Sequence, residues 1–236
     1  MRLRIFDDEA RYLDRFGLLL LITGIAVITL SLIDVGRSRD DLASAVAQLT
    51  VTIFVGATLL LALQASGVRP RFQLIANAVI GLGILASLAI VVLQAVGMSD
   101  PRDLGPRSIV WTVLSVFAPI LVIRRVVQHR RATLQTLLGA VSAYLLIALA
   151  FNFSFLLIGA FGGPFFGSEE PTTSFMYFSL VTLTTLGYGD LAAAEPIGRL
   201  MSTIEAVIGQ VYLVTFVAMI VGLMVAQARH ADAEHD

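Results

Sequence analysis

The chain has 236 residues, of which 57% are hydrophobic and 14% charged, and its mean hydropathy is +0.87. Soluble domains carry about 25% charged residues, so this composition indicates an integral membrane protein. The formal net charge of -1 gives no reason to expect nucleic acid as a partner. The absence of cysteine excludes disulfides and thiolate sites. No hydrolase, phosphate-binding or metal-site motif points to an enzyme or to a bound cofactor.

Six apolar runs approach the length of a membrane span. A hydrocarbon core about 30 Å thick needs roughly 20 apolar residues in a helix, and a lipid-exposed segment must satisfy its own backbone hydrogen bonds. We therefore predict an all-α integral membrane protein with six transmembrane helices, at residues 16–33, 42–64, 72–96, 109–127, 133–159 and 197–227. Between the last two, "FMYFSLVTLTT" is too short to span the membrane and is a candidate for a re-entrant helix.

Arginine placement predicts the orientation. With both termini in the cytoplasm, eleven of the sixteen arginines lie on the inner side and five on the outer side. Cytoplasmic loops carry the excess of basic residues, so this split favours cytoplasmic termini. We expect a multi-pass protein of the cell membrane, with residues 160–196 on the outer side.

The stretch "TLTTLGYGD" at residues 182–190 lies between two long apolar runs. Gly187 and Gly189 can adopt backbone angles that are closed to other residues, so successive carbonyls can point the same way. A row of carbonyl oxygens around one axis can replace the water shell of a monovalent cation. One chain supplies one such row, so a closed cage requires several chains.

Residues 185–190, "TLGYGD", resemble the selectivity filter of potassium channels, whose signature is T-V-G-Y-G-D, and point to the prokaryotic six-span members of that family. The preceding "YFSLVTLTT" resembles the pore helix, and the resemblance covers roughly residues 133–227. It implies a homotetramer in the lipid bilayer with K+ as the permeant ion. It also implies K+ sites at the carbonyls of Thr185, Leu186, Gly187 and Tyr188, with Gly189 completing the filter. We refer to residues 185–189 as the filter segment.

Other residues are predicted to support the filter segment. Tyr177 keeps a donor that can reach Asp190, and Thr182 and Thr184 flank the segment on its inner side. Glu205 lies well inside a predicted span, where an ionisable group is functional by default. A hydrogen-bonded support for the filter, a proton sensor and contact with the outer interface are the three interpretations of Glu205.

Three positions depart from the family pattern. Leu186 stands where the family usually has Val or Ile, and Phe178 lacks the donor that a tryptophan would offer to Tyr188. Val181 stands where some prokaryotic members have a glutamate. These departures put the rigidity of the filter in question.

The last span, at residues 197–227, is predicted to be the inner helix. Gly209 stands at the spacing of a hinge glycine, and helical periodicity predicts a cavity-lining face formed by Gly209, Leu213, Val217, Val221 and Met224. The alternative is that Gly209 only permits close helix packing. Gln210 faces either the cavity or a neighbouring helix, and the sequence does not choose between these positions.

The predicted organisation has three parts. Residues 1–131 form four spans, residues 132–228 form the pore domain with outer helix 133–159, pore helix 173–184 and inner helix 197–227, and residues 229–236 form a short tail. The fourth span has no basic residue from Ser108 to Ile123, which predicts weak or no voltage gating. A non-selective cation channel and a non-conducting membrane scaffold or regulatory subunit are the alternative functions.

Overall fold

The computed structural model describes residues 3–33, 50, 52–62, 70–95, 105–127 and 133–233. Most of these residues are helical and none of them forms a strand, which confirms the predicted all-α class. The helices are α1 (Leu3–Leu32), a short helix at Thr52–Ala62, α3 (Pro70–Ala95), α4 (Gly105–Val127), α5 (Leu134–Gly162), α6 (Thr172–Leu183), α7 (Pro196–Val211), the π-helix η1 (Tyr212–Val217) and α8 (Ala218–Ala233).

Two helical stretches in the described part of the chain are long and apolar enough to cross a membrane, Leu134–Gly162 and Pro196–Leu223. They coincide with the predicted outer and inner helices. Helices also cover the first, third and fourth predicted spans, whereas most of the second predicted span outside Thr52–Ala62 lies beyond the described residues. The six-span count therefore stays a prediction.

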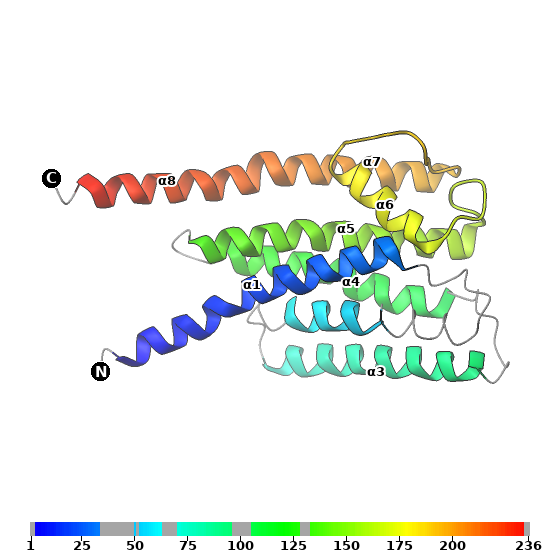
Figure 1. Ribbon diagram of the computed structural model, residues 1–236, viewed down its shortest axis with the longest axis horizontal. Coiled ribbons are helices and arrows are strands. Elements are labelled where there is room, and N and C mark those ends of the chain that lie inside the picture. Colours follow the sequence, from blue (N-terminus) through cyan, green and yellow to red (C-terminus); the bar gives the residue numbers. More distant parts are fainter. Residues whose placement is uncertain are drawn as a thin grey trace.

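Helix α5 is the central element of the fold, with α1 and α4 packed along it (Figure 1). It begins at a capping box in which Thr133 and Thr136 each bond the other's backbone amide, which satisfies donors that a helix start leaves free. This cap lies at the predicted border between the N-terminal spans and the pore domain. Along α5 most of the apolar window is buried, consistent with a helix surrounded by other helices.

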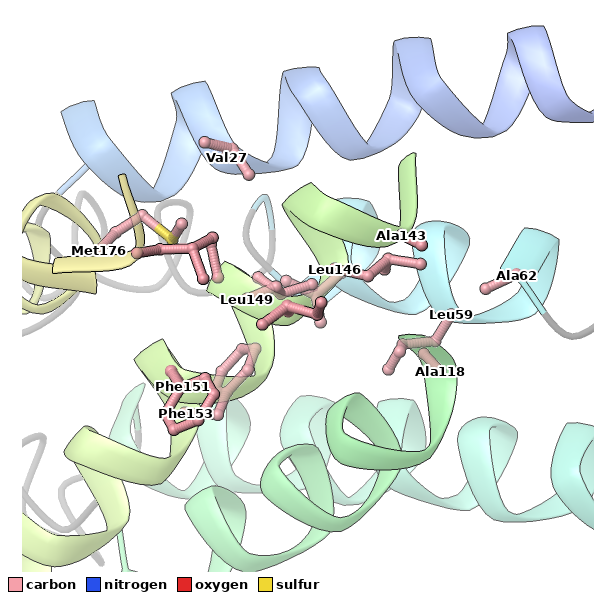
Figure 2. Close-up of a cluster of buried hydrophobic side chains, with 14 of the residues drawn as sticks. Val27, Leu59, Ala62, Ala118, Ala143, Leu146, Leu149, Phe151, Phe153 and Met176 are labelled. Atoms are coloured by element: carbon pink, nitrogen blue, oxygen red, sulfur yellow. The ribbon is translucent and has the colours of Figure 1, made fainter. Parts of the chain in front are cut away.

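The core around α5 joins the N-terminal helices to α6. Figure 2 shows this cluster, in which buried side chains come from α1, the short helix, α4, α5 and α6: Val27, Leu59, Ala62, Ala118, Ala143, Leu146, Leu149, Phe151, Phe153 and Met176. A buried hydrogen bond also joins α4 to α5, where Thr112 Oγ1 donates to the Phe153 carbonyl at 2.9 Å. Apolar packing and an interhelical hydroxyl bond are the usual means of holding helices together in a membrane.

The inner helix is continuous from α7 through η1 to α8, and it runs beside α5 in Figure 1. It extends to Ala233, so the predicted tail that starts at residue 229 begins inside a helix. The start of α1 and the end of α8 lie toward the same end of the bundle, and α6 lies toward the opposite end. Tyr212 fastens η1 to α5, because its hydroxyl donates to the Ala140 carbonyl at 2.7 Å.

Gly139 marks the closest approach between α5 and its two neighbours. A Cβ at this position would lie 2.9 Å from Val126 Cγ2 of α4 and 3.0 Å from Phe16 Cδ1 of α1. Both distances are shorter than ordinary van der Waals contact. The absence of a side chain therefore lets three helices meet at this point.

We expect Gly139→Ala to lower the thermal unfolding temperature of the purified protein in detergent. Overpacking of a helix contact costs about 1–3 kcal/mol. Gly81→Ala in α3 is the matched control, because a Cβ there meets nothing within 4 Å and alanine favours a helix over glycine by about 1 kcal/mol. Equal unfolding temperatures for the two variants would show that the contact at Gly139 is loose.

Candidate functional site

The filter segment follows the C-terminus of α6 directly. In this segment every second residue has a positive φ: Thr185 at 57°, Gly187 at 57° and Gly189 at 77°. Glycine adopts this region without strain, whereas an L-residue such as threonine does not. The backbone φ therefore alternates between positive and negative values over five residues, which no regular helix or strand does.

Three successive amides of this region donate back to the end of α6. The Thr185 amide donates to the Thr182 carbonyl at 3.0 Å, and those of Leu186 and Gly187 both donate to the Val181 carbonyl, at 2.9 and 3.3 Å. In a trans peptide the N–H points away from the preceding C=O. The carbonyls of Thr184, Thr185 and Leu186 therefore point away from α6, on one common side of the chain.

Thr182 and Thr184, which were predicted to support the filter segment, contact their neighbours through different groups. Thr182 accepts the Thr185 amide with its backbone carbonyl. Thr184 turns its hydroxyl back to the Leu180 carbonyl at 2.7 Å, closing the last turn of α6. Both residues therefore fix the start of the filter segment through bonds around the backbone.

The C-terminal end of the filter segment is tied to α6 by Tyr177. Its hydroxyl donates to Asp190 Oδ2 at 2.7 Å, as the sequence suggested. This bond raises the pKa of the Tyr177 phenol from 10.0 to about 12, because the neighbouring carboxylate favours the protonated phenol. The phenol remains a donor at neutral pH and fixes the distance between α6 and the residue that follows the filter segment.

Phe178 lies in an aromatic cluster with side chains from α5 and from the loop that follows α5. Its ring centroid is 5.3 Å from that of Phe155, 5.8 Å from that of Phe165 and 5.3 Å from that of Phe166. Phe165 also joins the loop before α6 to the loop before α7, because its carbonyl accepts the Ala194 amide at 2.9 Å. The missing donor at Phe178 is thus replaced by apolar packing, at 7% exposure.

Glu205 joins the inner helix to the back of α6. The hydroxyl of Ser179 on α6 lies 2.5 Å from Glu205 Oε1 and 2.8 Å from the Ala148 carbonyl on α5. Glu205 is fully buried, and its Oε2 has no hydrogen-bond partner among the described residues. The contact therefore links three helices, as expected of a hydrogen-bonded support, and complete burial overturns the alternative of contact with the outer interface.

Gly209 lies against the end of α6, so its predicted place in the cavity lining is wrong. A Cβ at Gly209 would lie 2.4 Å from the Leu183 carbonyl oxygen, and Tyr144 on α5 donates to that same oxygen at 3.2 Å. The glycine thus allows the inner helix to approach the α6 backbone closely, which was the alternative interpretation. The irregular turn of the inner helix lies further along, in η1.

The π-helix also changes the predicted cavity face beyond Gly209. A π-helix has more residues per turn than an α-helix, so residues after it are rotated relative to a stripe drawn with α-helical spacing. Leu213 and Val221 are exposed, whereas Val217 packs against the core. The side chain of Met224 lies outside the described residues.

Gln210 is a site residue that the sequence left undecided. Its Nε2 donates to Thr185 Oγ1 at 3.0 Å, and the Thr185 hydroxyl in turn lies 2.7 Å from the Thr184 carbonyl. In the sequence, Gln210 stands out because it is a polar residue inside an apolar span. The identity of its partner depends on how closely α7 packs against α6. This distance cannot be read from the sequence.

We expect Gly209→Ala to lower the thermal unfolding temperature strongly, because the new methyl group would overlap a backbone carbonyl that cannot rotate away. Displacement of packed backbone costs about 1–3 kcal/mol or more. Gly222→Ala on α8 is the matched control, since a Cβ there meets nothing within 4 Å. Similar unfolding temperatures for both variants would contradict the close approach of α7 to Leu183.

The Tyr177–Asp190 bond predicts a pH-dependent contribution to stability. A group whose pKa is raised on folding stabilises the folded state below its unfolded pKa, here 10.0, and loses that effect as pH rises through about 12. Tyr177→Phe should therefore unfold at a lower temperature than the unaltered protein below pH 10. The difference between the two should vanish toward pH 12. A constant difference across this window would show that the hydroxyl acts otherwise.

Comparison with protein-family models matches residues 140–226 to a family described as "Ion channel". The matched region runs from within α5 through α6, the filter segment, α7 and η1 into α8. Comparison with the curated proteins gave no match, and neither did comparison with the solved structures. Together with the two apolar helices that flank the filter segment, the family match supports an ion-channel domain in a membrane protein, with ion transport as its activity.

Proposed function

We propose that the chain is a potassium-selective channel that conducts K+ passively as a homotetramer. The observation that carries this proposal is the pair of successive amides, from Leu186 and Gly187, that donate to the one Val181 carbonyl. This pairing turns the Thr185 and Leu186 carbonyls to the same side. Rings of such carbonyls coordinate K+ in place of water, and the GYG sequence supports K+ as the ion.

The exposed surfaces of a single chain support the proposed assembly from four copies. One chain contributes one row of carbonyls, while Leu186 and Tyr188 are 55% and 67% exposed. The inner helix also presents an exposed apolar face formed by Ile197, Leu200, Ile204, Val207, Ile208 and Val211. Four chains around one axis would cover this face with neighbouring copies or lipid and would close the ring of carbonyls.

The direction of α6 favours cations at the inner end of the filter segment. An α-helix carries about half a negative charge at its C-terminus, and α6 ends at Leu183, next to Thr185. Four such termini would surround the inner end of the pathway. A cation that leaves the filter segment toward the middle of the membrane is stabilised by this field.

The alternatives predict different fluxes. A non-selective cation channel would pass Na+ and K+ alike, whereas a non-conducting scaffold or regulatory subunit would pass neither. The intact Gly-Tyr-Gly run disfavours the first. The alternating backbone at Thr185, Gly187 and Gly189 disfavours the second, because a scaffold has no need of strained threonine geometry.

We expect the purified protein in a planar bilayer to give a reversal potential that follows the K+ gradient and ignores the Na+ gradient. Its mass in detergent should correspond to four copies. Gly187→Ala should abolish the K+ current, because alanine at φ 57° costs about 1–2 kcal/mol in each chain. Gly162→Ala, where a Cβ meets nothing within 4 Å, should conduct normally.

Two results would contradict the proposal. A reversal potential that follows Na+ and K+ equally would identify a non-selective channel. No current from a folded four-copy assembly would favour the scaffold. Loss of current in Gly162→Ala as well as Gly187→Ala would show that the variants fail for a reason other than filter geometry.

The orientation and the gating are part of the same proposal. Both termini lie in the cytoplasm, in agreement with α1 starting and α8 ending toward one end of the bundle (Figure 1). Helix α4 has no basic residue between Ser108 and Ile123, so little charge moves in the field. In the recordings above, open probability should change little with voltage, and a steep dependence would contradict this.

A further inference from the structure

The contact between Gln210 and Thr185 has a defined direction. The Thr185 hydroxyl donates its single proton to the Thr184 carbonyl at 2.7 Å. Towards Gln210 the Thr185 oxygen can then only accept, so the amide nitrogen of Gln210, rather than its oxygen, faces it at 3.0 Å. A hydroxyl oxygen has two lone pairs, and this arrangement leaves one of them free.

The position of Gln210 is fixed by its neighbour in the chain. Gly209 holds the inner helix against the Leu183 carbonyl, and Glu205 one turn earlier contacts Ser179. Both contacts set the depth and rotation of α7 against α6. Gln210 is consequently placed beside Thr185, the first residue of the filter segment after α6.

Thr185 has a backbone conformation that a threonine holds only when its surroundings stabilise it. It is the one non-glycine residue in the described part of the chain with a positive φ. Backbone strain of this kind persists where the surroundings over-determine the conformation. Here the amide is held by the Thr182 carbonyl and the hydroxyl by Gln210 and the Thr184 carbonyl.

We propose that Gln210 is a positioning residue for the innermost cation site, where its amide nitrogen orients the Thr185 hydroxyl so that a free lone pair faces the ion. This inference rests on the proposed channel function. Gln210 supplies no charge, so it sets the direction of a ligand oxygen without adding electrostatic attraction of its own. In a four-copy assembly, four Gln210 side chains would act on four Thr185 hydroxyls around one ion.

We expect Gln210 to affect cation binding only through the Thr185 hydroxyl. Gln210→Met keeps the length of the side chain and removes the donor. Thr185→Val keeps the shape and removes the hydroxyl. Thr203→Val is the control, because the Thr203 hydroxyl is exposed and bonds only the Arg199 carbonyl of its own helix among the described residues.

The probe is Ba2+, a divalent cation close to K+ in size that binds oxygen ligands. The Kd for Ba2+ is obtained on the purified full chain from the rise of the thermal unfolding temperature with Ba2+ concentration, because a ligand of the folded state stabilises it by RT ln(1 + [L]/Kd). This readout needs no current. We expect Gln210→Met to weaken Ba2+ binding about 3- to 10-fold, the range given by one hydrogen bond. Thr203→Val should bind Ba2+ like the unaltered protein.

The double variant decides between a positioning and a structural role. If Gln210 acts through the hydroxyl, Gln210→Met has no further effect on Ba2+ binding in a Thr185→Val background. An equal effect in both backgrounds, or unchanged binding in the single variant, overturns the inference while K+ conduction by the unaltered protein still supports the channel. Absence of K+ conduction by the unaltered protein would instead overturn the proposed function.

Discussion

The filter segment depends on one carbonyl oxygen, that of Val181. It accepts two successive amides, from Leu186 and Gly187, which a regular helix or strand does not arrange. The first consequence is that α6 ends within one turn of this residue. The second is that the polar backbone atoms of the filter segment are divided, with amides toward the protein and carbonyls toward the opposite side. The amides find their hydrogen-bond acceptors at the end of α6.

The end of α6 can hold this conformation because other helices fix it. Tyr144 of α5 and the bare backbone of Gly209 on the inner helix meet at the Leu183 carbonyl. One turn earlier, Ser179 lies between the Ala148 carbonyl and Glu205. In a membrane such polar contacts between helices cannot be replaced by bulk water. The position of α6 is therefore determined from both of its flanking helices, and the filter segment inherits that position.

One stripe of the inner helix makes these contacts. Gly198 lies against the Phe165 ring, Glu205 against Ser179, Gly209 against the Leu183 carbonyl, and Tyr212 bonds to the Ala140 carbonyl. The intervals of seven, four and three residues repeat one helical face. Small residues stand where backbones approach and polar ones where a partner is in reach. The rest of α7 presents the exposed apolar side chains of Ile197, Leu200, Ile204, Val207, Ile208 and Val211, together with the exposed polar residues Arg199, Thr203 and Gln210.

Much of this architecture could be predicted from the sequence, because apolar length and turn chemistry act locally. The helices predicted at residues 133–159, 173–184 and 197–227 correspond to α5, α6 and the stretch from α7 to α8, the last of which extends to Ala233. The Tyr177–Asp190 bond could be anticipated because both residues flank a motif of known spacing. The partners of Gln210 and Ser179 could not, since they depend on how far one helix slides and rotates against another.

The predicted cavity-lining face is a second feature that could not be obtained from the sequence alone. A face drawn from Gly209 at α-helical spacing requires a regular α-helix, yet the chain changes to a π-helix at Tyr212. Nothing local demands this change: "YLVTFV" is an ordinary apolar sequence. Tyr212 does have a tertiary reason to deviate, because its hydroxyl bonds to the Ala140 carbonyl and its ring stacks on Tyr144 at 5.9 Å. Anchoring this ring to α5 fixes the helix on one side of the π-turn, and the extra residue then rotates every side chain that follows.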